Sequence, residues 1–197
     1  RDLDDLERQA GGLDRGAVRE PDVGLVRWDS LLGIEGGRIL EDDCARQVFL
    51  GDLTPANPAA SPADQARGVF ERMEAGFAAA SMSFNRLVRT WFFLDHLLDW
   101  YGSFNAVRTA FYGKRSMLEP PPASTGVDGR NAAGAALTAA AWAVEPKVGT
   151  AVQGVGSPLQ CPAPKYGSSF SRAMEIAGGG VRPHVVYPTP NNRRASC

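Results

Sequence analysis

The chain has 197 residues, of which 44% are hydrophobic, and this is enough for one globular core. Its formal net charge is −1, so the composition shows no electrostatic footprint for nucleic acid or anionic lipid. No apolar run approaches the roughly 20 residues of a membrane helix, and no cationic start with an apolar core marks a secretory signal.

The chain contains three cysteines and two histidines, and no two cysteines form a CxxC pair. A zinc site would need four such ligands to converge from scattered positions, so we expect no metal and no other cofactor. Widely spaced thiols are typical of a reducing compartment, and we therefore expect a cytoplasmic protein with reduced cysteines. These residues are Cys44, Cys161, Cys197, His96 and His184.

The first part of the chain predicts an arm followed by strands. Residues 1–24 are charged and glycine-rich, so we expect a flexible arm that buries little apolar surface. From residue 25 to Leu53 the sequence predicts short strands. Gly36–Gly37 between two such pieces indicates a hairpin turn.

The clearest helix begins after Ser61. Ser61 suits the N-cap, Pro62 the first helical position, and Asp64 supplies the acidic residue of a capping-box pattern. Apolar residues then recur at three- and four-residue spacings and predict one buried face of a helix. They are Val69, Phe70, Met73, Phe77 and Ala80.

Asn85–Leu94 predicts a central strand, because both of its alternating faces are largely apolar. A turn or short helix follows at residues 95–99, and then a helix over Trp100–Tyr112. We assign Gly113 to the position just after that helix. The two faces of the strand are expected to be Leu87, Arg89, Trp91, Phe93 and Val88, Thr90, Phe92.

Pro120–Pro122 forbid helix and predict extended chain that leads into a strand at Ser124–Val127. The alanine-rich segment 135–144 is ambiguous, because alanine favours helix whereas the flanking Gly134 and Pro146 favour a strand. We choose a strand for this segment on the resemblance described next.

The order strand–strand–helix–strand–helix–strand–strand over roughly residues 36–147 resembles the Rid family, also called YjgF-like or L-PSP proteins. Tyr101, Asn105 and Gly113 fall where that family has an aromatic residue, an asparagine and the closing glycine of its second helix. The resemblance implies an α+β fold in which a mixed β-sheet packs against two helices, and subunits that form homotrimers with ligand clefts between them. It is carried by QVFLGDL, the helix capped by Ser61, NRLVRTWFFLDHLLDW, and FNAVRTAFYG before a proline-rich bend.

The family's best-known activity is the hydrolysis of reactive enamine and imine intermediates. Such a site needs a fixed cation for the substrate carboxylate and a polar group that positions water. The family's arginine precedes the Ser/Thr pair after the proline-rich bend, and in this chain Ala123 stands there. The family's acidic residue in the last strand aligns with Ala140 or Thr138, so both charged groups are absent from their expected places.

Five residues remain as candidates for substrate binding, and the catalytic residues are unknown. Asn105, Ser124 and Thr125 keep the outline of the family's site. Arg108 and Arg130 are alternative carboxylate anchors. Each candidate also has a structural interpretation, as a polar residue of a helix or strand or as a surface charge.

After Lys147 the piece PAPKYGSSFSRAMEI resembles the opening of a second Rid unit. Tandem proteins of this kind are similar to the chorismatase group, which hydrolyses chorismate and carries its active site in the C-terminal half. About fifty residues cannot make a second core without the two helices. We therefore expect an arm (1–24), a Rid-like domain (25–147), and a linker with a truncated, partly disordered second copy (148–197) that adds one strand to the first domain.

Because the arginine is absent from its family position, we expect a metabolite-binding or structural module related to enamine and imine deaminases, weak or inactive as an enzyme. The alternative is a chorismatase-like hydrolase that acts on chorismate or a related carboxylated metabolite. The expected partners are a small carboxylated metabolite and further copies of the chain in a homotrimer or pseudo-trimer, with no nucleic acid and no membrane. A ribonuclease is disfavoured, because the sequence lacks a basic face with interleaved aromatics and a histidine pair.

Overall fold

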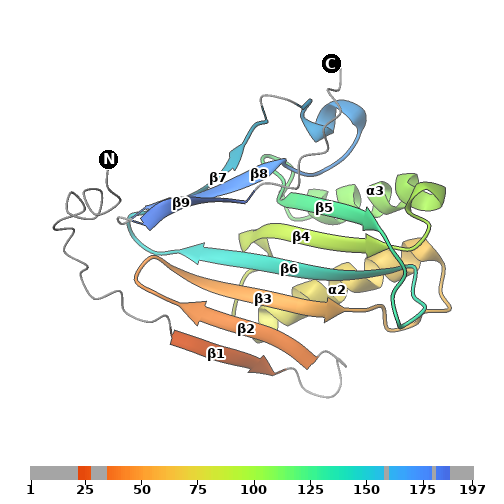
Figure 1. Cartoon of the computed structure of the whole chain (residues 1–197), viewed down its shortest axis with the longest axis horizontal. Helices are drawn as coiled ribbons and strands as arrows, with labels where there is room; N and C mark the ends of the chain where they lie inside the picture. Colours follow the sequence, from red (N-terminus) through yellow and green to blue (C-terminus); the bar gives the residue numbers. More distant parts are fainter. Residues whose placement is uncertain (1–21, 28–34, 158–159, 179–180, 187–197) are drawn as a thin grey trace, which may run out of the picture.

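The computed structural model describes residues 22–27, 35–157, 160–178 and 181–186. These residues form two β-sheets and two α-helices (Figure 1). Within them, no helix combines the length and the apolar character that crossing a membrane requires. The elements are β1 (Asp22–Arg27), β2 (Glu35–Glu41), β3 (Ala45–Leu53), α2 (Pro62–Ala79), η1 (Phe84–Arg86), β4 (Leu87–Leu94), α3 (Leu97–Gly113), β5 (Ala123–Asp128), β6 (Leu137–Pro146), β7 (Thr150–Val155), η2 (Ala163–Tyr166), β8 (Ala173–Gly178) and β9 (Val181–Val186).

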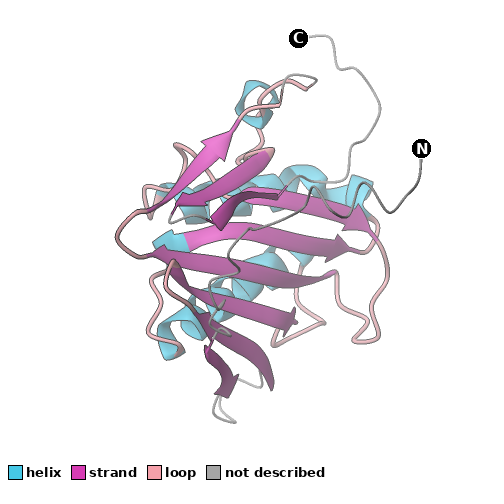
Figure 2. Ribbon diagram, turned by 60° about the vertical axis from the view of Figure 1, so that its left-hand side comes forward, coloured by secondary structure: helices cyan, strands magenta, loops and turns pink. Residues whose placement is uncertain are grey.

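The larger sheet has the strand order β1-β2-β3-β6-β4-β5. Its neighbouring strands are antiparallel except for β4 and β5, which run parallel because α3 carries the chain back between them. Both helices cover one face of this sheet (Figure 2). The predicted α+β class, a mixed sheet packed against two helices, is therefore confirmed.

The core lies between this sheet and the helices. The Ser61 hydroxyl accepts a hydrogen bond from the Asp64 amide at 3.2 Å, so α2 begins where the sequence predicts. Phe70 from α2 packs against Phe92 of β4 and Phe104 of α3, with ring centroids 5.5 and 6.4 Å away. All five apolar residues of the predicted α2 stripe are buried.

The alanine-rich segment forms β6 in the middle of the sheet, as predicted. The predicted turn at Gly36–Gly37 is wrong, because both glycines lie inside β2. Gly36 is the extra residue of a bulge opposite β1, where Val26 pairs with Gly37 and Arg27 with Glu35. Its φ of 138° lies in a region that favours glycine, so a strand irregularity produced the turn-like signal.

Two further details differ from the sequence prediction. The register of β4 against β6 shifts between Leu87 and Arg89, so the predicted faces of the strand are exchanged at its start. Leu87 packs in the helix-side core with Phe92, and Val88 packs on the opposite face with Trp91. Gly113 is the last residue of α3 rather than the residue beyond it, and the left-handed backbone occurs at Ser116, with φ of 55°. A β-bulge and the exact last residue of a helix leave no clear periodic signal in a single sequence.

Three strands after Lys147 form their own sheet, in the order β7-β8-β9, rather than adding one strand to the larger sheet. Met174 of β8 packs with Val88, Ala123 and Trp142 on the sheet face opposite the helices. An isolated parallel bridge joins Ser171 to Ala123. The three-part division of the chain stays a prediction, and most of its arm (1–21) and the end of its tail (187–197) lie outside the described residues.

The prediction of reduced thiols holds for Cys44, which is free. It is wrong for Cys161, a buried residue that is disulfide-bonded. Widely spaced cysteines in a sequence do not reveal which of them meet in the fold.

Candidate functional site

Arg108 of α3 is the centre of a buried polar cluster. Its side chain is 2% exposed and lies against the first residues of β5. One terminal nitrogen donates to Asn105 Oδ1 at 2.5 Å, and the other reaches Ser124 Oγ at 3.5 Å. Three of the five predicted binding residues therefore meet at one place.

Aromatic rings complete the surroundings of Arg108. The guanidinium carbon lies 5.2 Å from the centroid of the Phe104 ring and 5.1 Å from that of Phe170. Tyr101 contacts the same group. Burial raises the pKa of Tyr101, but hydrogen bonds with Ser168 and Asn105 and the positive charge of Arg108 outweigh burial and lower it.

Arg108 has no carboxylate partner among the residues that the structure describes. Its Nε–H group is buried and has no hydrogen-bond acceptor there. Burial lowers the pKa of this guanidinium, while the nearby phenols of Tyr112 and Tyr101 oppose that effect. A buried cation with only neutral neighbours is costly, so an anion that reached this place would be strongly favoured.

Ser124 and Thr125 lie on opposite faces of the sheet, because they are consecutive residues of β5. Ser124 faces the helices and accepts a hydrogen bond from Thr90 Oγ1 at 2.9 Å. Thr125 faces the other way and accepts one from Arg89 Nη2 at 2.8 Å. Only Ser124 therefore meets Arg108, and Thr125 lies on the other side of the sheet.

Arg89 is a buried residue that the sequence analysis assigned only to a strand face. It pairs with Ala123 in the sheet register, and its guanidinium carbon lies 4.9 Å from the centroid of the Trp91 ring. A charged residue in the middle of an apolar central strand was a signal that could have found it. A cation thus stands one strand away from the place of the family's arginine.

Ala123 itself leaves no room for a ligand. It is fully buried among Val88, Trp142 and Met174. Thr138 and Ala140 of β6, where the family's acidic residue aligns, pair instead with Phe93 and Trp91 of β4. The structure thus places no charged side chain at Ala123, Thr138 or Ala140, the positions that the sequence alignment singles out.

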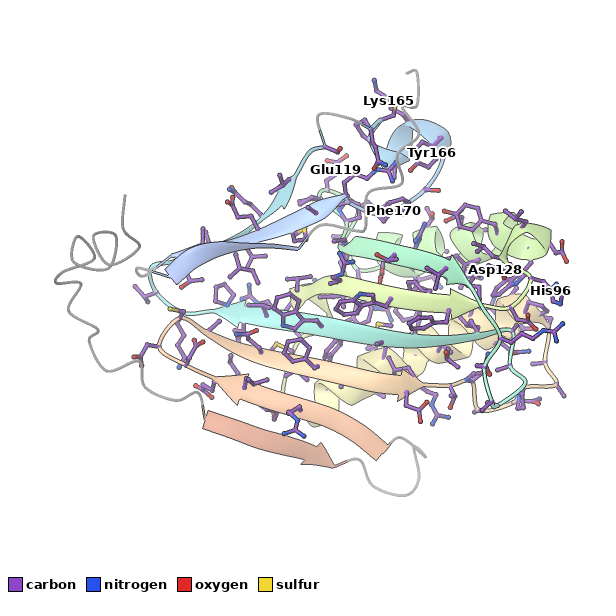
Figure 3. The ribbon with its side chains drawn as sticks, in the orientation of Figure 1. His96, Glu119, Asp128, Lys165, Tyr166 and Phe170 are labelled. Carbon is purple, nitrogen blue, oxygen red and sulfur yellow. The ribbon has the colours of Figure 1, made fainter. Side chains whose placement is uncertain are left out.

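Arg130 lies away from the cluster. Its side chain is 82% exposed, and its nearest charged partner is Asp95, with 3.7 Å between Nε and Oδ1. Asp95 directly follows β4, whose last residue, Leu94, pairs with Asp128 at the end of β5. Figure 3 shows Asp128 and His96 at the end of the sheet away from Phe170. Arg130 therefore does not join the other predicted binding residues.

The segment from Cys161 to Arg172 covers the Arg108 cluster. It runs from the second sheet around the edge strand β5 to α3, where Ser169 and Thr109 share a hydrogen bond of 2.7 Å. The Ser171 amide donates to Pro122 O at 2.9 Å. Figure 3 shows Tyr166 and Phe170 of this segment above β5 in that view. Sequence reasoning missed Phe170 because the contact spans more than 60 residues of chain.

Comparisons with solved structures agree with the predicted resemblance. TdcF from E. coli, solved with bound serine, is 25% identical, covers 50% of this chain and 80% of its own, and has a TM-score of 0.46. The YjgF gene product of E. coli gives the same four values. Rv2704 from Mycobacterium tuberculosis, a member of the YjgF/YER057c/UK114 family, is 19% identical, covers 62% of this chain and 98% of its own, and has a TM-score of 0.48.

About half of the chain is thus similar to solved structures of the YjgF/YER057c/UK114 family, and the resemblance stated from the sequence is confirmed at the level of the fold. No protein-family model and no curated protein matches the chain. TM-scores below 0.5 carry no information about activity or ligand. A function for this chain therefore has to be argued from its own side chains.

Proposed function

We propose that this protein is a binding module for a small carboxylated metabolite, held at Arg108 and without efficient turnover. The observation that supports it is the buried Nε–H of Arg108, which has no acceptor among the described residues. A carboxylate accepts two parallel hydrogen bonds from one guanidinium, and Nε with a terminal nitrogen offers such a pair. Ligand entry requires the Cys161–Arg172 segment to move, because Phe170 lies over the guanidinium.

Binding without efficient turnover follows from the neutral side chains around Arg108. Asn105, Ser124 and Tyr101 can form hydrogen bonds. None of them is a carboxylate or an imidazole that could act as a general acid or base near neutral pH. Hydrolysis of an imine needs such a group to position and activate water. Tyr101 is a phenol, which is a weak acid even with a lowered pKa. We therefore assign this side chain to ligand binding and not to catalysis.

The test is calorimetric titration of pyruvate, 2-oxobutyrate, serine and chorismate into the wild-type protein and two variants. Arg108→Met keeps an unbranched, largely apolar side chain but removes the guanidinium and its charge. Arg130→Gln is the matched control, since Arg130 is an exposed arginine remote from the cluster. We expect at least one carboxylate to bind the wild type and Arg130→Gln, and none to bind Arg108→Met.

Absence of binding to the wild type, or equal loss in both variants, would contradict the proposal. If Arg108→Met does not fold, Asn105→Ala replaces it, because it removes the acceptor 2.5 Å from the guanidinium and should weaken binding. Conversion of chorismate during the titration would contradict a module without turnover and favour the hydrolase alternative.

We also propose that copies of this chain associate through the sheet face opposite the helices. Phe93 and Val127 are neighbours in the register of β4 and β5 and are 44% and 41% exposed. Adjacent exposed apolar residues on a sheet are typical of an interface. Light scattering should give a homotrimer for the wild type and a monomer for Phe93→Glu, whereas a monomeric wild type would contradict it.

A further inference from the structure

A cavity separate from the Arg108 cluster lies where the two sheets meet. Its volume is about 260 Å³, slightly below the usual range for drug-sized ligands and suited to one amino acid. Arg86 and Glu119 line it, together with apolar side chains from both sheets. Among the apolar lining residues are Val88, Val144, Val152, Met117 and Met174.

The register of the sheet brings the two charged residues of this cavity to one edge. β4 and β5 are parallel, and Arg89 pairs with Ala123. Arg86 and Glu119 stand three and four residues before that pair, so both lie where the two adjacent strands begin. A cation and an anion thus border the same opening.

Both charges have capacity for a ligand. Arg86 has a distant partner, Glu145, with 3.9 Å between Nε and Oε1, and both side chains are about half exposed at 47%. Glu119 makes no ion pair among the residues that the structure describes. An exposed ion pair at this distance contributes little, so a ligand carboxylate can replace Glu145 at low cost.

The wall behind the charges is apolar and is shared by the two sheets. Val88 and Val144 belong to the larger sheet, whereas Val152 and Met174 belong to the smaller one. An aliphatic chain of a few carbons would contact both sheets at once. The cavity therefore brings two opposite charges together with apolar side chains from both sheets.

We propose that this cavity binds a free α-amino acid with an unbranched apolar side chain. Arg86 holds its carboxylate, Glu119 holds its ammonium group, and the side chain lies between the sheets against Met117 and Met174. The site is independent of the Arg108 cluster, which calls for a carboxylate alone. A ligand that needs both charges therefore distinguishes the two sites.

The chain's four methionines allow a direct test by NMR of ¹³C-methyl-labelled protein. Met117 and Met174 line the cavity, whereas Met73 and Met82 lie in the core beneath the helices and serve as internal controls. The probes are L-norleucine, hexanoate, which lacks the ammonium group, and hexylamine, which lacks the carboxylate. We expect norleucine alone to shift the Met117 and Met174 signals.

Glu119→Gln and Arg86→Gln should each weaken norleucine binding by about tenfold or more, the value of one charge-assisted hydrogen bond. Glu71→Gln, an exposed residue of α2, should leave it unchanged. The proposal is overturned if no signal shifts, if hexanoate shifts Met117 and Met174 as norleucine does, or if both cavity variants bind with wild-type affinity. Hexanoate binding at Arg108 would leave these two methyl signals in place.

Discussion

The guanidinium carbon of Arg108 lies 5.1 Å from the centroid of the Phe170 ring, and this contact joins α3 to the segment that follows β7. Phe170 lies equally close to Arg172, so one ring contacts two cations. The segment is also held by the Ser169–Thr109 hydrogen bond. The position of Cys161–Arg172 therefore depends strongly on Phe170.

Phe170→Ala should release this segment from α3. Each cation–π contact contributes about 0.5–2 kcal/mol, so local opening should become about tenfold or more easier. Hydrogen exchange should therefore speed up at the amides of Ser168 and Ser171, which donate to Ala163 O and Pro122 O. Lys165→Ala, at an exposed position of the same segment, is the control. Unchanged protection in Phe170→Ala would show that other contacts hold the segment.

The stability of the protein should fall in alkaline solution because of Tyr112. Burial raises the pKa of this fully buried phenol to about 12, against smaller opposing effects of Arg108 and Thr90. The stabilising contribution is complete below the ordinary pKa of about 10 and is lost as the pH rises from there through 12. The free energy of unfolding should drop by about 1.4 kcal/mol per pH unit in that window.

Tyr112→Phe is the matched variant for this pH effect. Its buried hydroxyl forms no well-aligned hydrogen bond among the described residues, and Thr90 is only a weak partner, so its removal should cost little at pH 8. Urea unfolding at pH 8, 10 and 11 should give a smaller alkaline loss for Tyr112→Phe than for the wild type. An equal alkaline loss of stability in the wild type and in Tyr112→Phe would show that other groups cause the effect.

Ser61→Ala should destabilise α2 at its first turn. The Ser61 hydroxyl accepts from the Asp64 amide, and loss of such a cap costs about 1 kcal/mol. Urea unfolding at neutral pH measures the difference. Ser103→Ala, at an exposed position inside α3, should be neutral. A loss as large in Ser103→Ala would contradict a specific capping effect.

Ala123→Arg should not restore a family-like site. Ala123 is fully buried against Val88 and Met174, so an arginine there is both too large and unpaired. We expect a loss of about 3 kcal/mol or more in the free energy of unfolding. Ala132→Arg, the same change at an exposed position in the loop after β5, should lose far less. A stable Ala123→Arg protein that binds carboxylates more tightly would contradict this account.

The sequence predicted the elements whose signals are local. Ser61 and Pro62 mark the start of α2, and the apolar strand before α3 carries its own pattern. The bulge at Gly36 was mistaken for a turn, because a glycine pair has the same local signature in both settings. Local sequence signals thus predicted the type of each element better than the positions of its bulges.

The candidate site was predicted only in part. Asn105, Arg108 and Ser124 meet as a group, since the helix places residues three apart on one side and β5 lies beneath them. Thr125 was grouped with Ser124 although alternation in a strand sends them to opposite faces. Phe170 could not be assigned, because nothing local indicates that its segment returns to α3.

The most direct test of carboxylate binding at Arg108 is NMR of its Nε–H group during titration with 2-oxobutyrate. This group lacks an acceptor among the described residues, so a bound carboxylate would give it one. We predict that the Arg108 Nε–H signal, identified by its absence in Arg108→Met, moves downfield and saturates while that of Arg130 stays in place. A stationary Arg108 signal throughout a series of small carboxylates would contradict the proposed function.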